Sequence, residues 1–358
     1  MSERGRTEEP DAPDGPTELA PGSWWGAVKR TVAEYKNDNL GDWAAALTYY
    51  SVLSIFPAML VVVSLIGLAG ESVSQDLIKN VGSMAPGSVK QVLTDAITQL
   101  QRGRAGASVA ALVGLVAALW SASGYVGAFM RASNAVYDVP EGRPIWKTLP
   151  LRMGITVVTL VLLSVSVMAV VITGPLARKA GDMIGLESAA VTAWDIAKWP
   201  ILLLVVSFLF ALLYWASPNA KQGFRWVSPG SVLALLIWLA ASAVFAFYAA
   251  NFSSYNKTYG SLAGIIIFLV WLWITNTAIL LGAELNAELE RGRAIAAGTP
   301  ATQEPYVEPR DTRAFDEADR DALNAAEHPD HPERPDRPEH AGHPERPDRP
   351  EDSERARP

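Results

Sequence analysis

Residues 44–60 read AAALTYYSVLSIFPAML, an apolar stretch that carries two adjacent tyrosines, two serines and a proline. Apolar residues continue to about residue 70, and roughly 20 such residues in a helix cross the hydrocarbon layer of a bilayer. The stretch therefore predicts a transmembrane helix over about 44–70. Because lipid does not pair with polar groups, we expect the polar side of this helix to face protein or a cavity.

The rest of the chain contains five more stretches of this kind. They cover about 107–130, 152–175, 197–216, 229–251 and 262–286. In lipid, backbone polar groups must be satisfied within the segment, so these spans are predicted to be helices. Ser228 and Pro229 place an N-cap and a first-turn proline before the fifth span, and Trp199-Pro200 is expected to open the fourth in a similar way. The predicted fold is all-α, a polytopic integral membrane protein with six transmembrane helices.

Two further segments are amphipathic. Residues 23–37 and 88–101 repeat apolar positions at helical spacing, and a weaker segment of this kind lies around 72–84. Such helices lie in the headgroup layer of a membrane or pack on the bundle, and the sequence leaves both open. The membrane domain is predicted to cover 23–292.

The ends of the chain have a different composition. Residues 1–22 and 293–358 hold few large apolar side chains, and HPERPDRPE occurs at 331–339 and again at 343–351. Such composition cannot form a core, so both tails are predicted to be disordered. Residues 1–22 carry a net charge of −4 and 301–358 carry −8, which leaves +5 on the body. A mildly basic body suits anionic lipid headgroups.

Lysine and arginine in the short loops set the predicted orientation. They are more numerous on the side that holds both termini, and the 131–152 loop contributes most of this bias. By the positive-inside rule, the sequence predicts a multi-pass membrane protein with both termini in the cytoplasm.

The residue types narrow the possible chemistry. The chain has no cysteine, and all four histidines lie in the C-terminal tail. The body is thus without the residues of Ser-His-Asp triads and the usual transition-metal sites. We find no phosphate loop, dinucleotide fingerprint or RNA-binding surface, and so we expect no catalytic residues, metal, cofactor or nucleic-acid partner.

Several polar residues in the spans are candidates for a substrate path. In the first span Tyr49, Tyr50, Ser54 and Pro57 fall with Asp42 within an arc of about 140°. Pro57 also permits a kink. One interpretation is a bendable helix that faces a substrate, and the other is hydroxyls that bond helix to helix.

The later spans supply the remaining candidates. Ser121 lies in the small-residue face of the second span, and Arg131 and Asn134 follow at its cytoplasmic edge, where an ionisable group needs a partner. Glu284, near the cytoplasmic end of the last span, is a possible partner for Arg131 or a headgroup-level site. The last span also carries a stripe of small and polar residues for close packing, namely Gly260, Gly264, Trp271, Thr275, Ala278, Gly282 and Asn286. Tyr255 and Tyr259 lie in an outer loop that forms a vestibule or an aromatic belt.

Four ordered segments resemble one family. They are AAALTYYSVLSIFPAMLVVVSLIGL, ALWSASGYVGAFMRASNAVYDVPEGRPIWK, LLYWASPNAKQGFRWVSPGSVLALLIWLAASAVFAFY and SYNKTYGSLAGIIIFLVWLWITNTAILLGAELNAELE. In this order they resemble the YihY/BrkB family of bacterial inner-membrane proteins, over about residues 25–292. The resemblance implies a six-helix membrane protein with a role in envelope integrity, linked to movement of lipids or lipid-linked envelope components. The family's old label as a ribonuclease finds no support in these residues.

Two functions follow as hypotheses. The first is a transporter or lipid-handling protein in which polar faces of the first, second and last spans form a path for an amphipathic envelope molecule. The second is a scaffold without transport activity that holds envelope-assembly proteins. Membrane lipids are the expected partners in both, and the sequence names neither the cargo, the energy source nor the oligomeric state.

Overall fold

The computed structural model describes residues 21–68, 108–171, 188–224, 227–251, 256–300 and 304–327. Within them the chain forms helices and no strand, apart from an isolated bridge between Ala220 and Pro309. The helices are α1 (Pro21–Asn37), α2 (Leu40–Leu68), α5 (Ser108–Val136), α6 (Ile145–Val171), α8 (Ser188–Ala216), α9 (Pro229–Asn251), α10 (Asn256–Ala296) and α11 (Glu317–Glu327). The prediction of an all-α fold is confirmed for these residues.

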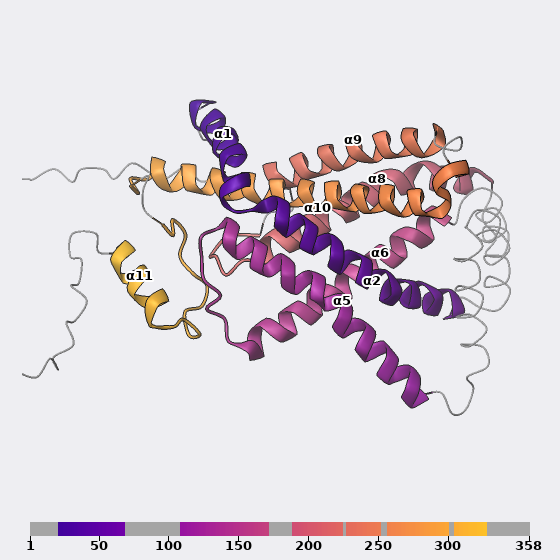
Figure 1. Ribbon diagram of the computed structural model, residues 1–358, viewed down its shortest axis with the longest axis horizontal. Helices are drawn as coiled ribbons and strands as arrows, with labels where there is room; N and C mark the ends of the chain where they lie inside the picture. The colour runs from indigo at the N-terminus through magenta and orange to yellow at the C-terminus, as the bar shows by residue number, and fades with distance from the viewer. Residues whose placement is uncertain are drawn as a thin grey trace, which may run out of the picture.

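The long helices form an elongated bundle (Figure 1). Helix α10 is central, because it packs against α1, α2, α5 and α9, while α6 joins α5 and α2 to α8. Helices α1 and α11 lie at the same end of the bundle, on the left in Figure 1. We call this the α1 end, and it is the end predicted to be cytoplasmic.

Among the described residues, four helices are long and apolar enough to cross a bilayer. These spans are Ile145–Val170, Ala189–Ala216, Pro229–Tyr248 and Gly264–Ala296. Many large apolar side chains on them are exposed in the monomer, for example Val165, Leu236 and Ile265, as expected of helices that face lipid. That α2 and α5 also span the membrane stays a prediction, and the segments at 72–84 and 88–101 lie outside the described residues.

One predicted helix start is confirmed and one is wrong. Ser228 and Ser231 exchange hydrogen bonds between side chain and backbone at 2.9 and 3.1 Å, which caps α9 just before Pro229. Pro200, by contrast, lies inside α8, twelve residues after its first residue Ser188. The helix continues through the proline because residues 188–199 are themselves compatible with a helix, and proline disturbs only the preceding turn.

Helix α1 packs on the end of α10. Ala27 is fully buried against Leu285 and Leu289, and the buried Thr31 donates to the Ala27 carbonyl at 3.0 Å. Val32 on the other side is 67% exposed. The packing alternative is therefore correct for one face of this helix, and contact of the exposed face with headgroups stays a prediction.

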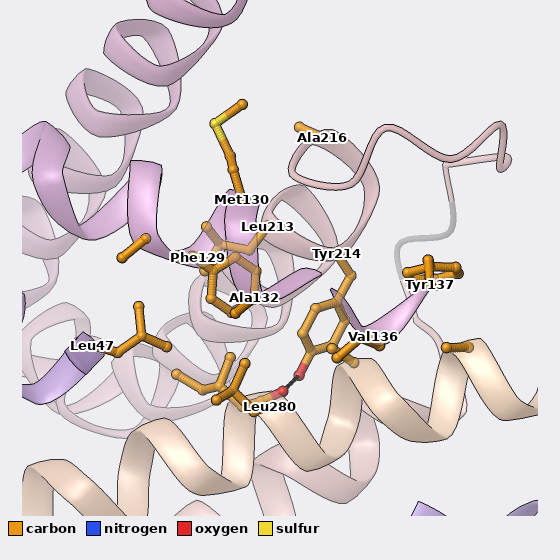
Figure 2. Packing of buried hydrophobic residues seen from close by; sticks show 14 of the residues in the cluster. Leu47, Phe129, Met130, Ala132, Val136, Tyr137, Leu213, Tyr214, Ala216 and Leu280 are labelled. Carbon is orange, nitrogen blue, oxygen red and sulfur yellow. Dashed lines mark hydrogen bonds between the residues drawn. The ribbon is translucent and has the colours of Figure 1, made fainter. Parts of the chain in front are cut away.

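Four aromatic rings stack at the centre of the core, and two of them, Phe129 and Tyr214, are labelled in Figure 2. Tyr125, Phe129, Tyr214 and Phe210 follow one another with ring centroids 6.3–6.5 Å apart. The Tyr214 hydroxyl donates to the Ile279 carbonyl at 2.7 Å, so a polar tip in an apolar core is satisfied by α10. The stack joins α5 and α8 to the central helix.

The predicted close-packing stripe of α10 meets α9 towards the α1 end. Ala278 is fully buried, and a Cβ on either Gly230 or Gly282 would overlap backbone of the other. Asn286 accepts from the Gly230 amide at 2.9 Å and donates to Ser228 Oγ at 3.0 Å. The small residues thus permit close approach of α9 and α10, and the Asn286 side chain stabilises the contact. At Gly264, in contrast, a Cβ would meet open space.

The C-terminal segment is more ordered than its composition predicts. Helix α10 continues to Ala296, and residues 304–327 are described, with Val307, Asp311 and Phe315 buried. The prediction of disorder from 293 onwards is therefore wrong for this part. Specific backbone pairing explains the difference: Arg310 donates to the Asn219 carbonyl at 2.7 Å and Ala314 to that of Gly142 at 2.9 Å.

Candidate functional site

The candidate residues from the sequence fall into separate sets of contacts. Tyr49, Tyr50 and Ser54 lie on α2, and Ser121 and Arg131 lie exposed on α5. Asn134 belongs to a buried network at the α1 end, and Glu284 lies beneath the turn between α1 and α2. Pro57 and Tyr259 lie in α2 and α10 with side chains outside the described part, and Tyr255 lies outside the described residues.

Arg152 is the centre of the first set. From α6, its Nε and Nη2 donate to Ser123 Oγ on α5 at 2.9 and 2.6 Å. Its guanidinium lies 5.4 Å from the centroid of the Trp120 ring, which adds a cation–π contact. Gly127 gives it room, because a Cβ there would lie 3.1 Å from Nη1. Trp120, Ser123 and Gly127 repeat at helical spacing and form one stripe on α5.

Arg131 continues this stripe one turn further. It is exposed, and it lies near enough to Arg152 for the two cations to repel each other. Within the described chain neither arginine forms an ion pair with a carboxylate, whereas Arg143 and Arg293, for example, do. At 1.5 Å per residue, Arg152 lies about 10 Å from the start of α6. We call Arg131 and Arg152 the arginine pair.

Helix α2 borders this surface. The Tyr50 ring packs on Gly124, where a Cβ would lie 2.9 Å from its Cδ1, and Tyr49 contacts Tyr50 edge to face. Ser54 donates to the Tyr50 carbonyl at 2.7 Å and lies 3.5 Å from that of Ala122. Tyr50 and Ser54 therefore line the contact between α2 and α5, beside the arginine pair.

The predicted inward face of α2 is wrong in part. Tyr49 is 60% exposed and Asp42 is also exposed, whereas Leu40, Ala44 and Leu47 are fully buried. The hydroxyls of this helix are satisfied by carbonyls one turn earlier, as in Ser54, so they impose no inward orientation. Apolar packing then decides which face is inside.

The side-chain amide of Asn276 occupies the interior between α2, α5 and α10. Asn276, 1% exposed, accepts from the Tyr125 hydroxyl at 3.1 Å and donates to Thr48 Oγ1 at 3.1 Å and Ser51 Oγ at 3.5 Å. The polar sides of the three helices thus bond to one another. Sequence reasoning missed Asn276, although a lone asparagine in an apolar run signals an interhelical hydrogen bond.

Asn134 ties the loops at the α1 end together. Its Oδ1 accepts from the Asn219 amide at 2.7 Å, and its Nδ2 donates to Glu141 at 3.0 Å. Glu141 also accepts two bonds from the Arg143 side chain and one from its backbone amide, and Arg143 Nη2 donates to the Ser217 carbonyl at 2.7 Å. With every polar end of Asn134 occupied inside the protein, its position favours a structural role.

The C-terminal segment completes this network. Asn219 donates to the Asp311 carbonyl at 2.8 Å and accepts from the Asp311 amide at 3.1 Å. The Asp311 carboxylate accepts from Arg313 and Lys147 at 2.7 and 2.9 Å, and these cations hold the pKa of Asp311 well below its usual range. The segment is therefore fastened to the loops after α5 and α8.

Glu284 does not pair with Arg131, so that possibility is wrong. Its side chain is 1% exposed and hydrogen-bonded to Asp38, in the turn between α1 and α2. Its Oε2 has no hydrogen-bond partner in the described structure. Burial raises the pKa of Asp38 from 3.8 to about 6.

Other kinds of site find little support among the described residues. No group of three or more His, Cys, Asp or Glu residues there could hold a metal ion. A cavity of about 80 Å³ opens between α8, α9 and α10, with Tyr137, Gln222 and Asn286 in its lining. It has room for several water molecules rather than a lipid. The arginine pair is thus the candidate site that the geometry favours.

Known proteins give a consistent comparison. A protein of Bacillus subtilis (strain 168) named "Putative ribonuclease-like protein YfkH" is 30% identical over 257 residues, 72% of this chain and 92% of its own length. A UPF0761 membrane protein of Alkalilimnicola ehrlichii is 30% identical over 75% of this chain, which spans 60% of that longer protein. A UPF0761 membrane protein of Aggregatibacter aphrophilus is 23% identical over 72% of this chain and 90% of its own length. No solved structure matches.

Two of these relatives are named membrane proteins, and the ribonuclease-like name of the Bacillus protein is itself marked as putative. The profile of the Virulence factor BrkB family matches residues 31–306, which cover α2, α5, α6, α8, α9 and α10 in full. Both the profile and the first relative cover most of the chain. The chain is a membrane protein of the virulence factor BrkB family, the YihY/BrkB family of the sequence resemblance.

Proposed function

We propose that this protein binds and moves anionic lipid, or a lipid-linked envelope component with an anionic headgroup, and that this activity maintains the integrity of the cell envelope. The observation that carries the proposal is the arginine pair. Two guanidinium groups repel each other on the surface of membrane helices, and no described carboxylate neutralises either one. An arginine at that depth needs a partner, and a phosphate accepts bidentate bonds from guanidinium groups.

The surroundings of the pair suit an amphipathic ligand. Trp120 is 56% exposed beside Arg152, and Val116 one turn above is 58% exposed, so acyl chains would find an apolar flank. Tyr50 packs on Gly124 of α5, and Ser54 on α2 and the exposed Ser121 on α5 carry further hydroxyls. The guanidinium of Arg152 is held by Ser123 and the Trp120 ring, so it is oriented before a headgroup arrives.

A liposome assay tests the proposal. Purified protein in vesicles that contain a fluorescent anionic phospholipid should move that lipid between leaflets faster than empty vesicles do. R131A and R152A should each lower the rate several-fold, and Y50F should lower it less. The matched control is R320A, because Arg320 lies exposed on α11, away from the membrane helices. Wild-type protein that behaves as empty vesicles do would contradict transport.

One observation favours the scaffold as a second candidate. The contact of Asn276 with Tyr125 and Thr48 closes the space in which a central path was expected. A scaffold needs no path, and a lipid bound at the arginine pair would then anchor it. Wild-type protein that binds anionic lipid but moves none would favour this alternative.

A further inference from the structure

The turn between α1 and α2 places one carboxyl group directly on another. Asp38 lies in this turn, next to Asn39, whose φ is 53°, and its side chain is hydrogen-bonded to that of Glu284 on α10. Two carboxylates have no proton to share and repel each other. A hydrogen bond between two carboxyl groups therefore requires that one of them carries a proton.

Burial makes full ionisation of this pair still less favourable. Glu284 is 1% exposed, and its Oε2 has no hydrogen-bond partner in the described structure. Leu40, directly after the turn, is fully buried in the core. A carboxylate at Glu284 would leave a charge buried without compensation, which is costly.

The charges around the pair add to the repulsion. Carboxyl groups reach it from every neighbouring element: Glu34 from α1, Asp138 from the loop after α5, Glu288 from α10 and Glu304 from the C-terminal segment. Two cations, Arg30 and Arg291, lie close to these carboxyl groups. Both form ion pairs with Glu288, and Arg291 also pairs with Glu304 at 3.0 Å. Tyr137 and Tyr306 are neutral neighbours, because burial raises the pKa of each phenol. Acidic groups outnumber basic ones here.

We propose that Asp38 and Glu284 form a proton-binding site that holds the turn between α1 and α2 against α10. In the bound state Glu284 donates the shared proton to Asp38. Release of the proton would set two charges against each other and loosen the turn, with α1 and the start of α2. The site does not include the arginine pair, so both a lipid-handling protein and a scaffold can carry it.

The pH dependence of stability has a defined sign. Asp38 has a pKa raised from 3.8 to about 6 in the folded protein, so between these values the folded state holds more protons than the unfolded state. Stability is then full below about pH 4 and falls as the pH rises towards 6 and beyond. Asp138, whose pKa burial and neighbouring carboxylates raise from 3.8 to about 7, adds an effect of the same sign.

Thermal unfolding of detergent-purified protein from pH 4 to pH 8 tests the site. Wild-type Tm should fall with rising pH in this range. E284Q should lose most of that slope and keep a high Tm at pH 8, because an amide donates to Asp38 without a proton. D38N should lose the slope as well, and E317Q on α11 is the matched control that should keep it. A wild-type slope unchanged in E284Q would overturn the proposal.

Infrared spectroscopy gives a second readout that does not depend on unfolding. At neutral pH the wild-type protein should show a protonated carboxyl band that is absent in E284Q and present in E317Q. If Na⁺ at pH 8 raises the wild-type Tm as acid does, while the carboxyl band is missing, the site binds a metal cation and the proton proposal is wrong. Gel filtration of each variant separates loss of the slope from loss of the fold.

Discussion

At the scale of single residues, the chain uses polar side chains in the membrane in two ways. Asn276 and Asn286 are occupied by partners on neighbouring helices and fix the bundle. In the arginine pair, a serine and an aromatic ring hold Arg152, and neither arginine has a carboxylate partner among the described residues. Satisfied groups stabilise the fold, and we propose that the arginine pair, which lacks a described counter-charge, binds a ligand.

Asn276 provides a prediction about stability. N276L should lower the free energy of unfolding by roughly 1 kcal/mol or more, because the Tyr125 hydroxyl loses its acceptor in the core. Thermal unfolding in detergent measures the loss. T277V is the matched control, since the Thr277 hydroxyl is exposed and bonds only its own helix. Equal Tm values for the two variants would contradict a structural role for Asn276.

At the scale of elements, the segment after α10 holds two loops in place. It contacts the loop after α5 through Gly142 and the loop after α8 through Asn219. At Gly142 the backbone of Asp311 and the ring of Phe315 leave no space for a Cβ. Glycine is required here by close approach, and Asn219 then bonds both sides of the contact.

This contact predicts the effect of G142A. The added methyl group would collide with the Asp311 carbonyl, so the segment should detach while the membrane helices stay folded. Trypsin should then cleave after Arg310 and Arg313 several times faster than in the wild type, with the fragments identified by mass spectrometry. G154A is the control, because a Cβ at Gly154 meets nothing within 4 Å. Unchanged cleavage in G142A would show that the contact does not hold the segment.

At the scale of the whole molecule, sequence patterns predict what is local. Runs of apolar residues predicted the helices, and Ser228-Pro229 predicted the start of α9, because hydropathy and capping depend on neighbours in the chain. Contacts between distant residues were not predictable in the same way. Arg152 was counted as a loop charge, and the pairing of Glu284 with Asp38 depends on how α1 folds onto α10.

The same limit explains the C-terminal segment. Residues 304–327 are rich in charge and poor in large apolar side chains, which predicts disorder. Their order comes from a few specific pairs, such as Asp311 with Lys147 and Arg310 with the Ala220 carbonyl. Composition averages over residues and cannot show such pairs.

The central claim is that the arginine pair binds an anionic lipid headgroup, and native mass spectrometry of the protein released from mixed-lipid nanodiscs tests it most directly. Wild-type protein should retain phosphatidylglycerol in preference to phosphatidylcholine by several-fold. The double variant R131A/R152A should retain both lipids equally, while R320A should behave as the wild type does. The same preference for phosphatidylglycerol in the double variant and in the wild type would contradict the claim.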